Sequence, residues 1–340
     1  MFDDMTDGVV RVITSCCCGA VCLAAVSNQA ATYDFTAGIS STNGWQPYVP
    51  LAAYGTAYSF SDSPAGYEIQ SAPCVNPTLL GPARVGTFLP GSFGDFDLSF
   101  DIPSYSASLN EFFGAAARIQ TIGLLTSSGY AFGYDNSIGK LILYKVVNEQ
   151  FQPFPSPTNP PVAPRLQVES VGSGSFGISW SSTPGQVYRA EYNSTLGSND
   201  WVTISPDQAG TGGKLAILVQ PSTEPRRFYR VLTFRVGPSQ AVALTPGQGY
   251  RFTFQGIGAS FGGAVYSLNN LMTPLAVVGC TDSTYSSGEA GLLVASRTAA
   301  GPADQTFSRF TIIPEPSPAL LMTLGALTIW GVTAKRRSRA

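Results

Sequence analysis

Apolar and polar residues alternate in several short runs of this chain. From Phe96 to Ile102 every second side chain is apolar, which is the pattern of a strand with one buried face. Similar runs at 129–134 and 140–147 flank the stretch 135–139, which has the composition of a hairpin loop. Helical periodicity is almost absent between residues 32 and 310. The pattern therefore predicts an all-β body.

A proline-rich stretch divides this body. Residues 151–164 contain six prolines, which cannot donate hydrogen bonds to a sheet and favour an extended spacer. The strand-like runs beyond it follow each other closely and fit a small antiparallel sandwich at 165–236. These runs are 166–171, 175–180, 187–192, 201–204, 215–219 and 227–232. Further runs follow at 250–255, 263–267, 275–278, 291–294 and 306–312.

Two resemblances suggest how these parts fit together. The segments Ile178-Ser-Trp180, Pro184-Gly-Gln-Val-Tyr-Arg189 and Phe228-Tyr-Arg-Val231 resemble a fibronectin type III-like module. Gly129-Tyr-Ala-Phe132, the run at 141–145 and the stretch 282–310 resemble concanavalin A-like (laminin G-like) jelly rolls, in which the first and last strands are neighbours. The resemblance implies one discontinuous jelly roll, 32–150 and 237–312, interrupted by the linker 151–164 and the inserted sandwich 165–236.

Composition and charge exclude several functions. The chain has no histidine, so Ser-His and Cys-His catalysis and His-ligated zinc are excluded. Its net charge is −2 and its body has no basic block, so nucleic-acid binding has no electrostatic basis. The 36 Gly and 25 Pro, with 44% hydrophobic residues, are typical of a folded protein rich in turns.

The two ends of the chain have the character of targeting segments. Arg11 precedes an uncharged run that ends near Ala30, which predicts a signal peptide over residues 1–31. At the other end, the uncharged run 319–334 spans about 24 Å as a helix, close to the thickness of a bilayer core. A basic cluster follows this run and is expected to stay on the cytoplasmic side; it consists of Lys335, Arg336, Arg337 and Arg339.

The C-terminal segment 313–340 also contains a Pro-Glu-Pro motif, formed by Pro314, Glu315 and Pro316. Together with the apolar run and the basic cluster, this motif resembles the PEP-CTERM sorting signal. The resemblance implies that an exosortase, a membrane-embedded cysteine peptidase, processes the tail. It also implies that the body, transiently anchored in the membrane, ends at the surface or in the matrix of a Gram-negative-type bacterium.

Only Cys74 and Cys280 lie in the body of the chain. In an exported protein, two such cysteines predict one disulfide, with two unpaired buried thiols as the alternative. A discontinuous jelly roll would place both in one domain.

No motif identifies a catalytic centre. The Glu-x-Asp-x-x-Glu pattern of many jelly-roll glycosidases is absent. Asp95, Asp97 and Asp101 share one strand face, which we interpret as the polar outer face of an alternating strand. Polysaccharide lyases use Tyr with Lys or Arg, so the nearest candidates are Tyr130, Tyr134, Tyr144 and Lys145; packing and surface positions are the alternative interpretation.

Binding residues are also hard to assign. Asp282 precedes a Gly-containing loop and is a weak candidate ligand for Ca²⁺, which needs six to eight oxygens; capping a turn is the alternative. Trp45, Tyr48, Tyr54 and Tyr58 either stack on sugar rings or belong to the core.

The sequence favours a non-enzymatic surface or matrix protein whose jelly roll contacts extracellular polysaccharide. The sugar-binding part of this hypothesis rests on analogy with the fold. The alternatives are a carbohydrate-active hydrolase or lyase with a mechanism free of histidine, and a structural adhesin or spacer without a defined ligand.

Overall fold

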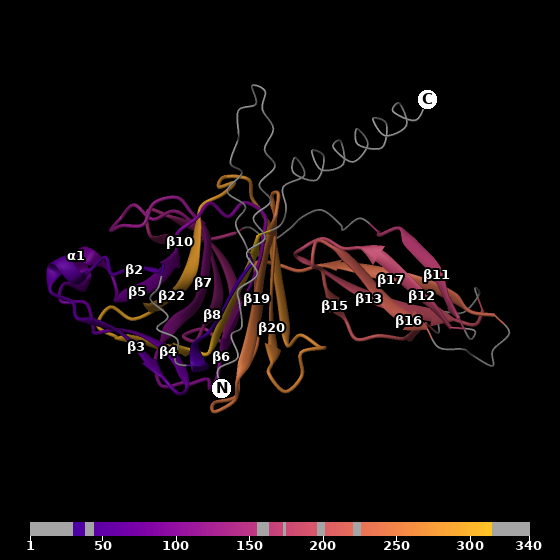
Figure 1. The fold of residues 1–340 in the computed structure, drawn as a ribbon, viewed down its shortest axis with the longest axis horizontal. Coiled ribbons are helices and arrows are strands. Elements are labelled where there is room, and N and C mark those ends of the chain that lie inside the picture. The colour runs from indigo at the N-terminus through magenta and orange to yellow at the C-terminus, as the bar shows by residue number, and fades with distance from the viewer. Residues whose placement is uncertain are drawn as a thin grey trace, which may run out of the picture.

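The computed structural model describes residues 30–37, 44–154, 163–172, 175–195, 201–219 and 226–314. Within these ranges the chain is almost entirely β structure, with one short helix, α1 (Pro77–Leu80), and two 3-10 turns, η1 (Phe35–Ala37) and η2 (Ala52–Tyr54). Two large antiparallel sheets, A and B, form the main body, and a smaller β unit lies to one side of it (Figure 1).

Sheets A and B contain strands from both halves of the chain. Sheet A has six strands, in the order β1 (Ala31–Asp34), β24 (Arg309–Pro314), β6 (Phe96–Ile102), β19 (Tyr250–Ile257), β20 (Ser260–Ser267) and β21 (Ala276–Thr281). Sheet B has eight, in the order β10 (Gln150–Pro153), β9 (Lys140–Val147), β8 (Gly129–Asp135), β7 (Glu111–Ile119), β22 (Glu289–Ser296), β5 (Arg84–Leu89) and β2 (Gln46–Tyr48), with β18 (Ser239–Ala241) also paired to β9. A third sheet, C, contains β23 (Ala303–Phe307), β4 (Gly66–Ser71) and β3 (Tyr58–Ser63).

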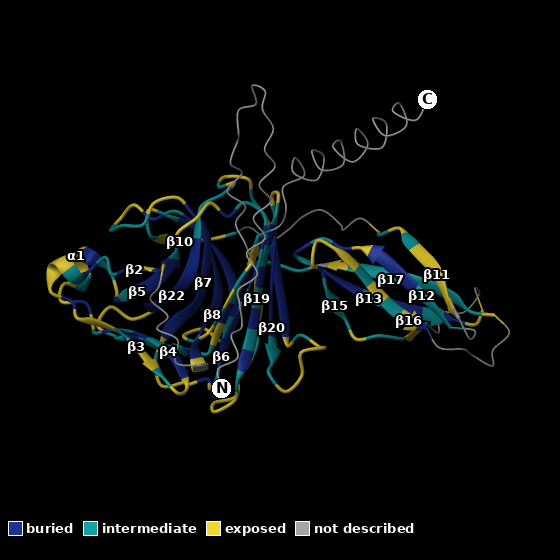
Figure 2. Cartoon of the chain, viewed as in Figure 1, coloured by how far each residue is buried: buried dark blue, intermediate teal, exposed yellow. Residues whose placement is uncertain are grey.

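The main core lies between sheets A and B and is rich in aromatic side chains. The ring of Phe132 on β8 stacks on that of Phe254 on β19, with centroids 5.3 Å apart. Phe113 on β7 meets Phe252 edge to face at 5.8 Å. The strand β6 has the bounds expected from its alternation, and its four inward side chains are fully buried. In sheet B the strands β7 and β8 are buried along their whole length and are dark blue in Figure 2. Burial of these large apolar surfaces holds the two sheets together.

This arrangement confirms the predicted fold class. The first strand of the body, β1, pairs with the last, β24, with Ala31 opposite Ile312. Strands from before and after the central segment are direct neighbours in sheet A, because β6 lies between β24 and β19. The body is therefore an all-β jelly-roll sandwich that is interrupted by a second, smaller β unit.

The smaller unit, which we call the insert, contains two sheets whose strands pair only with one another. They are β11 (Leu166–Gly172), β12 (Ser175–Ser181) and β16 (Lys214–Val219) in one sheet, and β13 (Gln186–Asn193), β14 (Val202–Thr203), β15 (Gln208–Ala209) and β17 (Phe228–Arg235) in the other. Trp180 and Tyr188 form the centre of its own core. Its resemblance to fibronectin type III modules stays a prediction.

The insert packs on the outer face of sheet A, beside β20 (Figure 1). Gly185 of the insert approaches the backbone of β21 so closely that a Cβ on Gly279 would lie 2.1 Å from the Gly185 Cα atom. Val187 packs there against Ala264 and Val277. Glycine is needed at this contact because any larger side chain would separate the two units.

Two details differ from the predictions. The strand β10 occupies Gln150–Pro153, so the start of the expected linker 151–164 is part of sheet B. Proline is accepted there because β10 is an edge strand. The single strand expected at 306–312 is divided at Ser308, and its halves belong to sheets C and A.

Candidate functional site

A large hollow, of about 580 Å³, lies along the three strands of sheet C. Two other pockets of the described residues are much smaller, about 80 Å³ and about 30 Å³, which leaves room for a few water molecules. We call the large one the Tyr58 hollow. The residues that line it are Ala57, Tyr58, Ser59, Gln70, Ser71, Ala72, Ser108, Leu109, Pro302, Ala303 and Asp304.

Sheet C forms because both of its hairpin strands alternate. On the inner face, Ile69 and Phe307 are fully buried in the main core. The outer face carries short polar side chains, and β3 is drawn mostly as exposed in Figure 2. The hairpin turn contains Gly66 at φ 137°, where a Cβ atom would lie 2.2 Å from the Phe307 carbonyl oxygen. A glycine is therefore required where β3 and β4 meet β23.

A row of hydrogen-bonded side chains crosses all three strands of sheet C. The Ser59 hydroxyl donates to the Gln70 Oε1 atom at 2.9 Å, and the Gln70 Nε2 atom donates to the Asp304 Oδ2 atom at 3.1 Å. The backbone pairing places Ser59 opposite Gln70 and Gln70 opposite Asp304. Because each side chain is held by its neighbour on a rigid sheet, the row is pre-organised for contact with a polar ligand.

Tyr58, the first residue of β3, also lines the hollow. The strand pairing places its side chain on the face of Phe60 and Ile69, so the ring lies at the edge of sheet C and not within the row. The Tyr58 side chain is 47% exposed although it touches Phe60 edge to face at 5.8 Å. A hollow lined by an exposed ring and by hydrogen-bonding groups suits a ligand with both apolar and hydroxyl surfaces.

A buried carboxyl group lies under the hollow. Glu111, at the start of β7, is 3% exposed, and its Oε2 atom accepts a hydrogen bond of 2.9 Å from the main-chain N–H of Asp304. Burial, with the nearby Asp304 carboxylate, raises the pKa of Glu111 to about 8. Burial and the neighbouring Glu68 also raise the pKa of Asp304. At neutral pH the Glu111 carboxyl is therefore mainly uncharged.

The structure separates the four aromatic candidates into two classes. Trp45 and Tyr48 are 8% and 5% exposed and belong to the core, whereas Tyr54 and Tyr58 are 50% and 47% exposed. Trp45 packs edge to face on Phe310. Tyr48 donates a hydrogen bond to Glu149. Of the four, Tyr58 lines the large hollow.

Asp282 lies in a network of protein donors. Its Oδ1 atom accepts hydrogen bonds from the Tyr130 hydroxyl at 2.6 Å and from the Thr284 N–H at 2.8 Å. Its Oδ2 atom lies 3.2 Å from the Lys145 ammonium. Burial acts to raise the pKa of Asp282, but the hydrogen bonds from Tyr130, Thr284 and Lys145 outweigh it and lower the pKa to about 2. This carboxylate therefore caps its own loop and neutralises Lys145.

The same network bears on the calcium candidate. A cation next to Asp282 would have to displace the Lys145 ammonium and add further oxygen ligands. In the part of the chain that the structure describes, no three His, Cys, Asp or Glu side chains come together as a group that fits a metal ion.

The lyase candidates are held in packing contacts. Tyr130 is fully buried, and burial together with its hydrogen bond to Asp282 raises its pKa. Tyr134 donates to the Val242 carbonyl. Tyr144 is 5% exposed, and its hydroxyl lies 3.3 Å from Asp135. The structure brings Tyr130 and Lys145 together at Asp282, where the Tyr130 hydroxyl is out of reach of a polymer.

The three aspartates around β6 are bound by donors of the fold. Asp95 pairs with the buried Arg118 at 3.2 Å, Asp97 accepts from Gln255 at 3.1 Å, and Asp101 forms a two-point ion pair with Arg251 at 2.7 Å. Asp101 is 6% exposed, so it is more buried than an outer-face position predicts. The Arg251 guanidinium on the neighbouring strand compensates for this burial.

The expected disulfide between Cys74 and Cys280 is wrong, because both are free thiols in the described structure. Cys74 packs with Leu51 and Leu80 near α1. Cys280 lies on β21, next to the junction with the insert. Figure 1 shows α1 at one end of the body and β20 on the side of the body that faces the insert. Membership of one domain did not bring the two thiols together.

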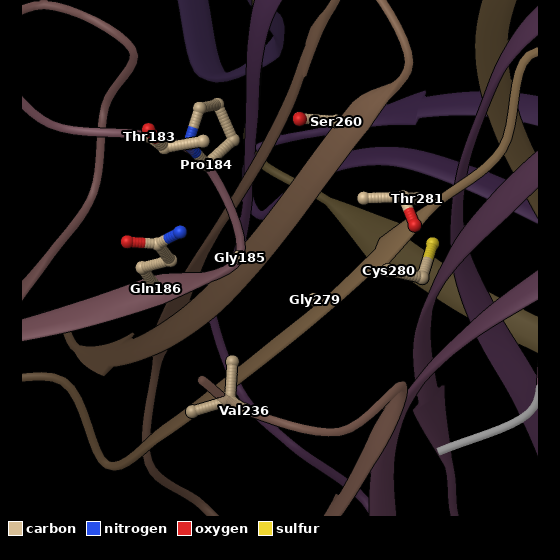
Figure 3. A pocket seen from close by; sticks show the side chains of 9 residues that line it. All are labelled: Thr183, Pro184, Gly185, Gln186, Val236, Ser260, Gly279, Cys280 and Thr281. Atoms are coloured by element: carbon tan, nitrogen blue, oxygen red, sulfur yellow. The ribbon is translucent and has the colours of Figure 1, made fainter. Parts of the chain in front are cut away.

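The junction itself contains the pocket of about 80 Å³. Figure 3 shows Pro184, Gly185 and Gln186 of the insert on one side and Gly279, Cys280 and Thr281 on the other. Burial and the nearby Asp282 raise the pKa of the Cys280 thiol. This pocket is a gap between two packed units and is too small for a sugar.

The sorting residues lie largely outside the described residues. Pro314 is the last residue of β24. Glu315, Pro316 and the basic residues Lys335, Arg336, Arg337 and Arg339 fall outside, as do residues 1–29 of the expected signal peptide. In the described ranges there is no helix with the length and apolar character that crossing a bilayer requires.

Sequence reasoning found Tyr58 but missed Ser59, Gln70, Asp304 and Glu111. A usable signal was present for the first two, because the segment from Tyr58 to Ser71 alternates around a turn with Pro and Gly. Asp304 and Glu111 carry no such signal, since Asp304 reaches the hollow, and Glu111 reaches the Asp304 N–H, only through the folding of distant segments.

Known structures show a distant likeness to this chain. No protein-family model matches the sequence. No curated protein matches it either. Carbohydrate-binding module CBM66 from Bacillus subtilis is similar over 78% of this chain and 94% of that chain, with 11% identity and a TM-score of 0.34. The exoplasmic/lumenal domain of VIP36, in a form bound to Ca²⁺ and mannose, is similar over 82% of this chain and 86% of the VIP36 chain, with 6% identity and a TM-score of 0.34. Basic winged bean lectin with Tn-antigen is similar over 85% of this chain and 100% of the lectin chain, with 10% identity and a TM-score of 0.35. Likeness at this level does not indicate a function.

Proposed function

We propose that this chain is a non-enzymatic protein that binds polysaccharide outside the cytoplasm, and that the Tyr58 hollow is its sugar site. One observation carries the proposal: the half-exposed Tyr58 ring and the hydrogen-bonded row Ser59–Gln70–Asp304 line the same hollow. A pyranose has apolar C–H faces and hydroxyl edges. The ring suits the first, and the side-chain row suits the second.

Size and rigidity support this assignment. A hollow of about 580 Å³ lies within the range of small-ligand sites, about 300–1,000 Å³. It is also open along sheet C, so a polymer chain can extend past it. The polar groups are fixed by cross-strand hydrogen bonds, which lowers the entropy lost on binding.

Export and tail processing form the second part of the proposal. The signal-peptide-like segment, the Pro314-Glu315-Pro316 motif and the basic C-terminal cluster support delivery to the cell surface or matrix after exosortase cleavage. A protein delivered in this way meets extracellular polysaccharide as a natural ligand.

The test is glycan binding by the full chain and by Tyr58→Ala, with Tyr54→Ala as the matched control. Both tyrosines are about half exposed, but only Tyr58 lines the hollow. We expect Tyr58→Ala to weaken binding at least tenfold, since stacked aromatic residues dominate such contacts, and Tyr54→Ala to leave it unchanged. Equal loss in both variants, or none in either, would place the site elsewhere.

The same samples distinguish the alternatives. Release of sugar fragments during incubation would show a carbohydrate-active enzyme and contradict the proposal. Absence of binding to every glycan on a broad array would favour the structural adhesin or spacer.

A further inference from the structure

The charges around the Tyr58 hollow are one-sided. Asp304 is the one charged residue among those that line it, and none of these lining residues is Lys or Arg. Glu68 lies on the same outer face of β4, two residues before Gln70, and acts on Asp304 as a like charge. Glu111 lies beneath it and binds the Asp304 N–H. The site is therefore built from acidic and neutral groups.

One oxygen of Asp304 is available to a ligand. Its Oδ2 atom accepts the hydrogen bond from Gln70. Within the described ranges, its Oδ1 atom has no hydrogen-bond donor from the protein. Asp304 thus presents one acceptor to the hollow while Gln70 fixes its orientation, and an ionised carboxylate binds a cationic donor more strongly than a neutral one.

From this charge pattern we infer that the hollow prefers glycans with free amino groups, such as partly de-N-acetylated hexosamine polymers, and rejects glycans with carboxylate groups. This inference rests on the proposed function and specifies its ligand class. An ammonium near Asp304 gains a charge-assisted hydrogen bond, whereas a uronate carboxylate meets Asp304 and Glu68 as like charges.

The size of the preference follows from exposure. The hollow is open to solvent, so one ion pair there changes affinity by about threefold to fivefold. Salt screens charges at such a site, with a Debye length of about 10 Å at 0.1 M and about 3 Å at 1 M. The preference for the amine should therefore shrink at high salt, while the contribution of Tyr58 should persist.

The experiment is titration of the full chain at pH 6 with three defined pentasaccharides: glucosamine, N-acetylglucosamine and galacturonate. We expect glucosamine to bind about threefold to fivefold more tightly than N-acetylglucosamine in 0.05 M salt, and galacturonate to bind more weakly than either. In Asp304→Asn the glucosamine preference over N-acetylglucosamine should disappear, because the side-chain amide oxygen can still accept from Gln70 but carries no negative charge. Glu169→Gln, which removes an exposed acid on the insert, should retain the preference.

Each remaining outcome decides the matter. Equal affinity for the amino and N-acetyl sugars, or equal preference in Asp304→Asn, overturns the inference and leaves the proposed function intact. Tight binding of galacturonate that is abolished by Tyr58→Ala also overturns the inference and leaves the proposed function intact. No binding of any of the three sugars, together with a silent glycan array, overturns the proposed function and the inference with it.

Discussion

The main-chain N–H of Asp304 donates a 2.9 Å hydrogen bond to the buried carboxyl group of Glu111. These residues lie on β23 and β7, far apart in the sequence. The contact connects the polar row of the Tyr58 hollow to the interior of the sandwich. The ionisation of Glu111 consequently affects both the stability of the fold and the position of Asp304.

Stability should fall with rising pH because of Glu111. Burial raises its pKa from 4.5 to about 8, so the folded state holds a proton that the unfolded chain releases. The stabilisation is fully present below pH 4.5 and is lost as the pH rises through about 8. Between these values the loss is on the order of 1.4 kcal/mol per pH unit at most.

Glu111→Gln tests this directly by urea unfolding at pH 5, 7 and 9. The free energy of unfolding of the variant should fall much less between pH 5 and 9 than that of the parent. At pH 9 the variant should be the more stable of the two. Glu169→Gln, on the exposed face of the insert, should follow the parent curve. A parent curve that rises steadily between pH 5 and 8 would contradict the assignment.

Replacing Arg118 should strongly destabilise the protein. Arg118 is 1% exposed, and its guanidinium donates to the carbonyls of Gly94 and Gly258 and pairs with Asp95. Arg118→Met removes the donor to both carbonyls and the charge partner of Asp95, at a cost of about 3–5 kcal/mol. Arg309→Met, at an exposed position, should change stability by less than about 0.5 kcal/mol. Urea unfolding curves of both variants provide the measurement, and similar midpoints would refute the role of Arg118.

A methyl group at Gly279 should loosen the insert. The Cβ atom would lie 2.1 Å from the Gly185 Cα atom, so the insert must move away from sheet A. We expect Gly279→Ala to increase hydrogen exchange in β13 and β21 while the strands facing the main core stay protected. At Gly177, where the nearest atoms are 3.8 Å and 4.0 Å from the added Cβ, the same substitution should have no such effect. Unchanged exchange in β13 and β21 would mean that the junction tolerates the methyl group.

Both body cysteines should react as protected thiols. Cys74 is buried, so a reagent has little access to it. Burial together with Asp282 raises the pKa of Cys280, so the reactive thiolate of that residue is scarce in the native protein. Alkylation of the native chain at pH 8 should modify each residue at less than about a tenth of its rate in urea. In urea without a reductant both should react fully. A peptide with Cys74 linked to Cys280 in the mass spectrum would show that the two cysteines form a disulfide, and would contradict this prediction.

Part of the fold could be predicted from local pattern. The alternation at Phe96–Ile102 and the long apolar runs gave β6 and β9 with the bounds that the structure has. By contrast β7 was missed, because it is buried on both faces and its residues, such as Ala115 and Ala116, show no alternation. The division at Ser308 was also missed, since the bend there follows from pairing with two different sheets.

By itself the sequence determined the all-β class and the absence of histidine chemistry, because composition and period-two patterns act locally along the chain. The targeting segments expected at the two ends stay a prediction. Tertiary structure decided the rest. It separated Tyr58 from Trp45, which have the same aromatic character but different burial. It brought Asp304 to Gln70 and Glu111, and it kept Cys74 away from Cys280. Such contacts depend on which strands pair across long stretches of chain, and a local pattern does not specify that pairing.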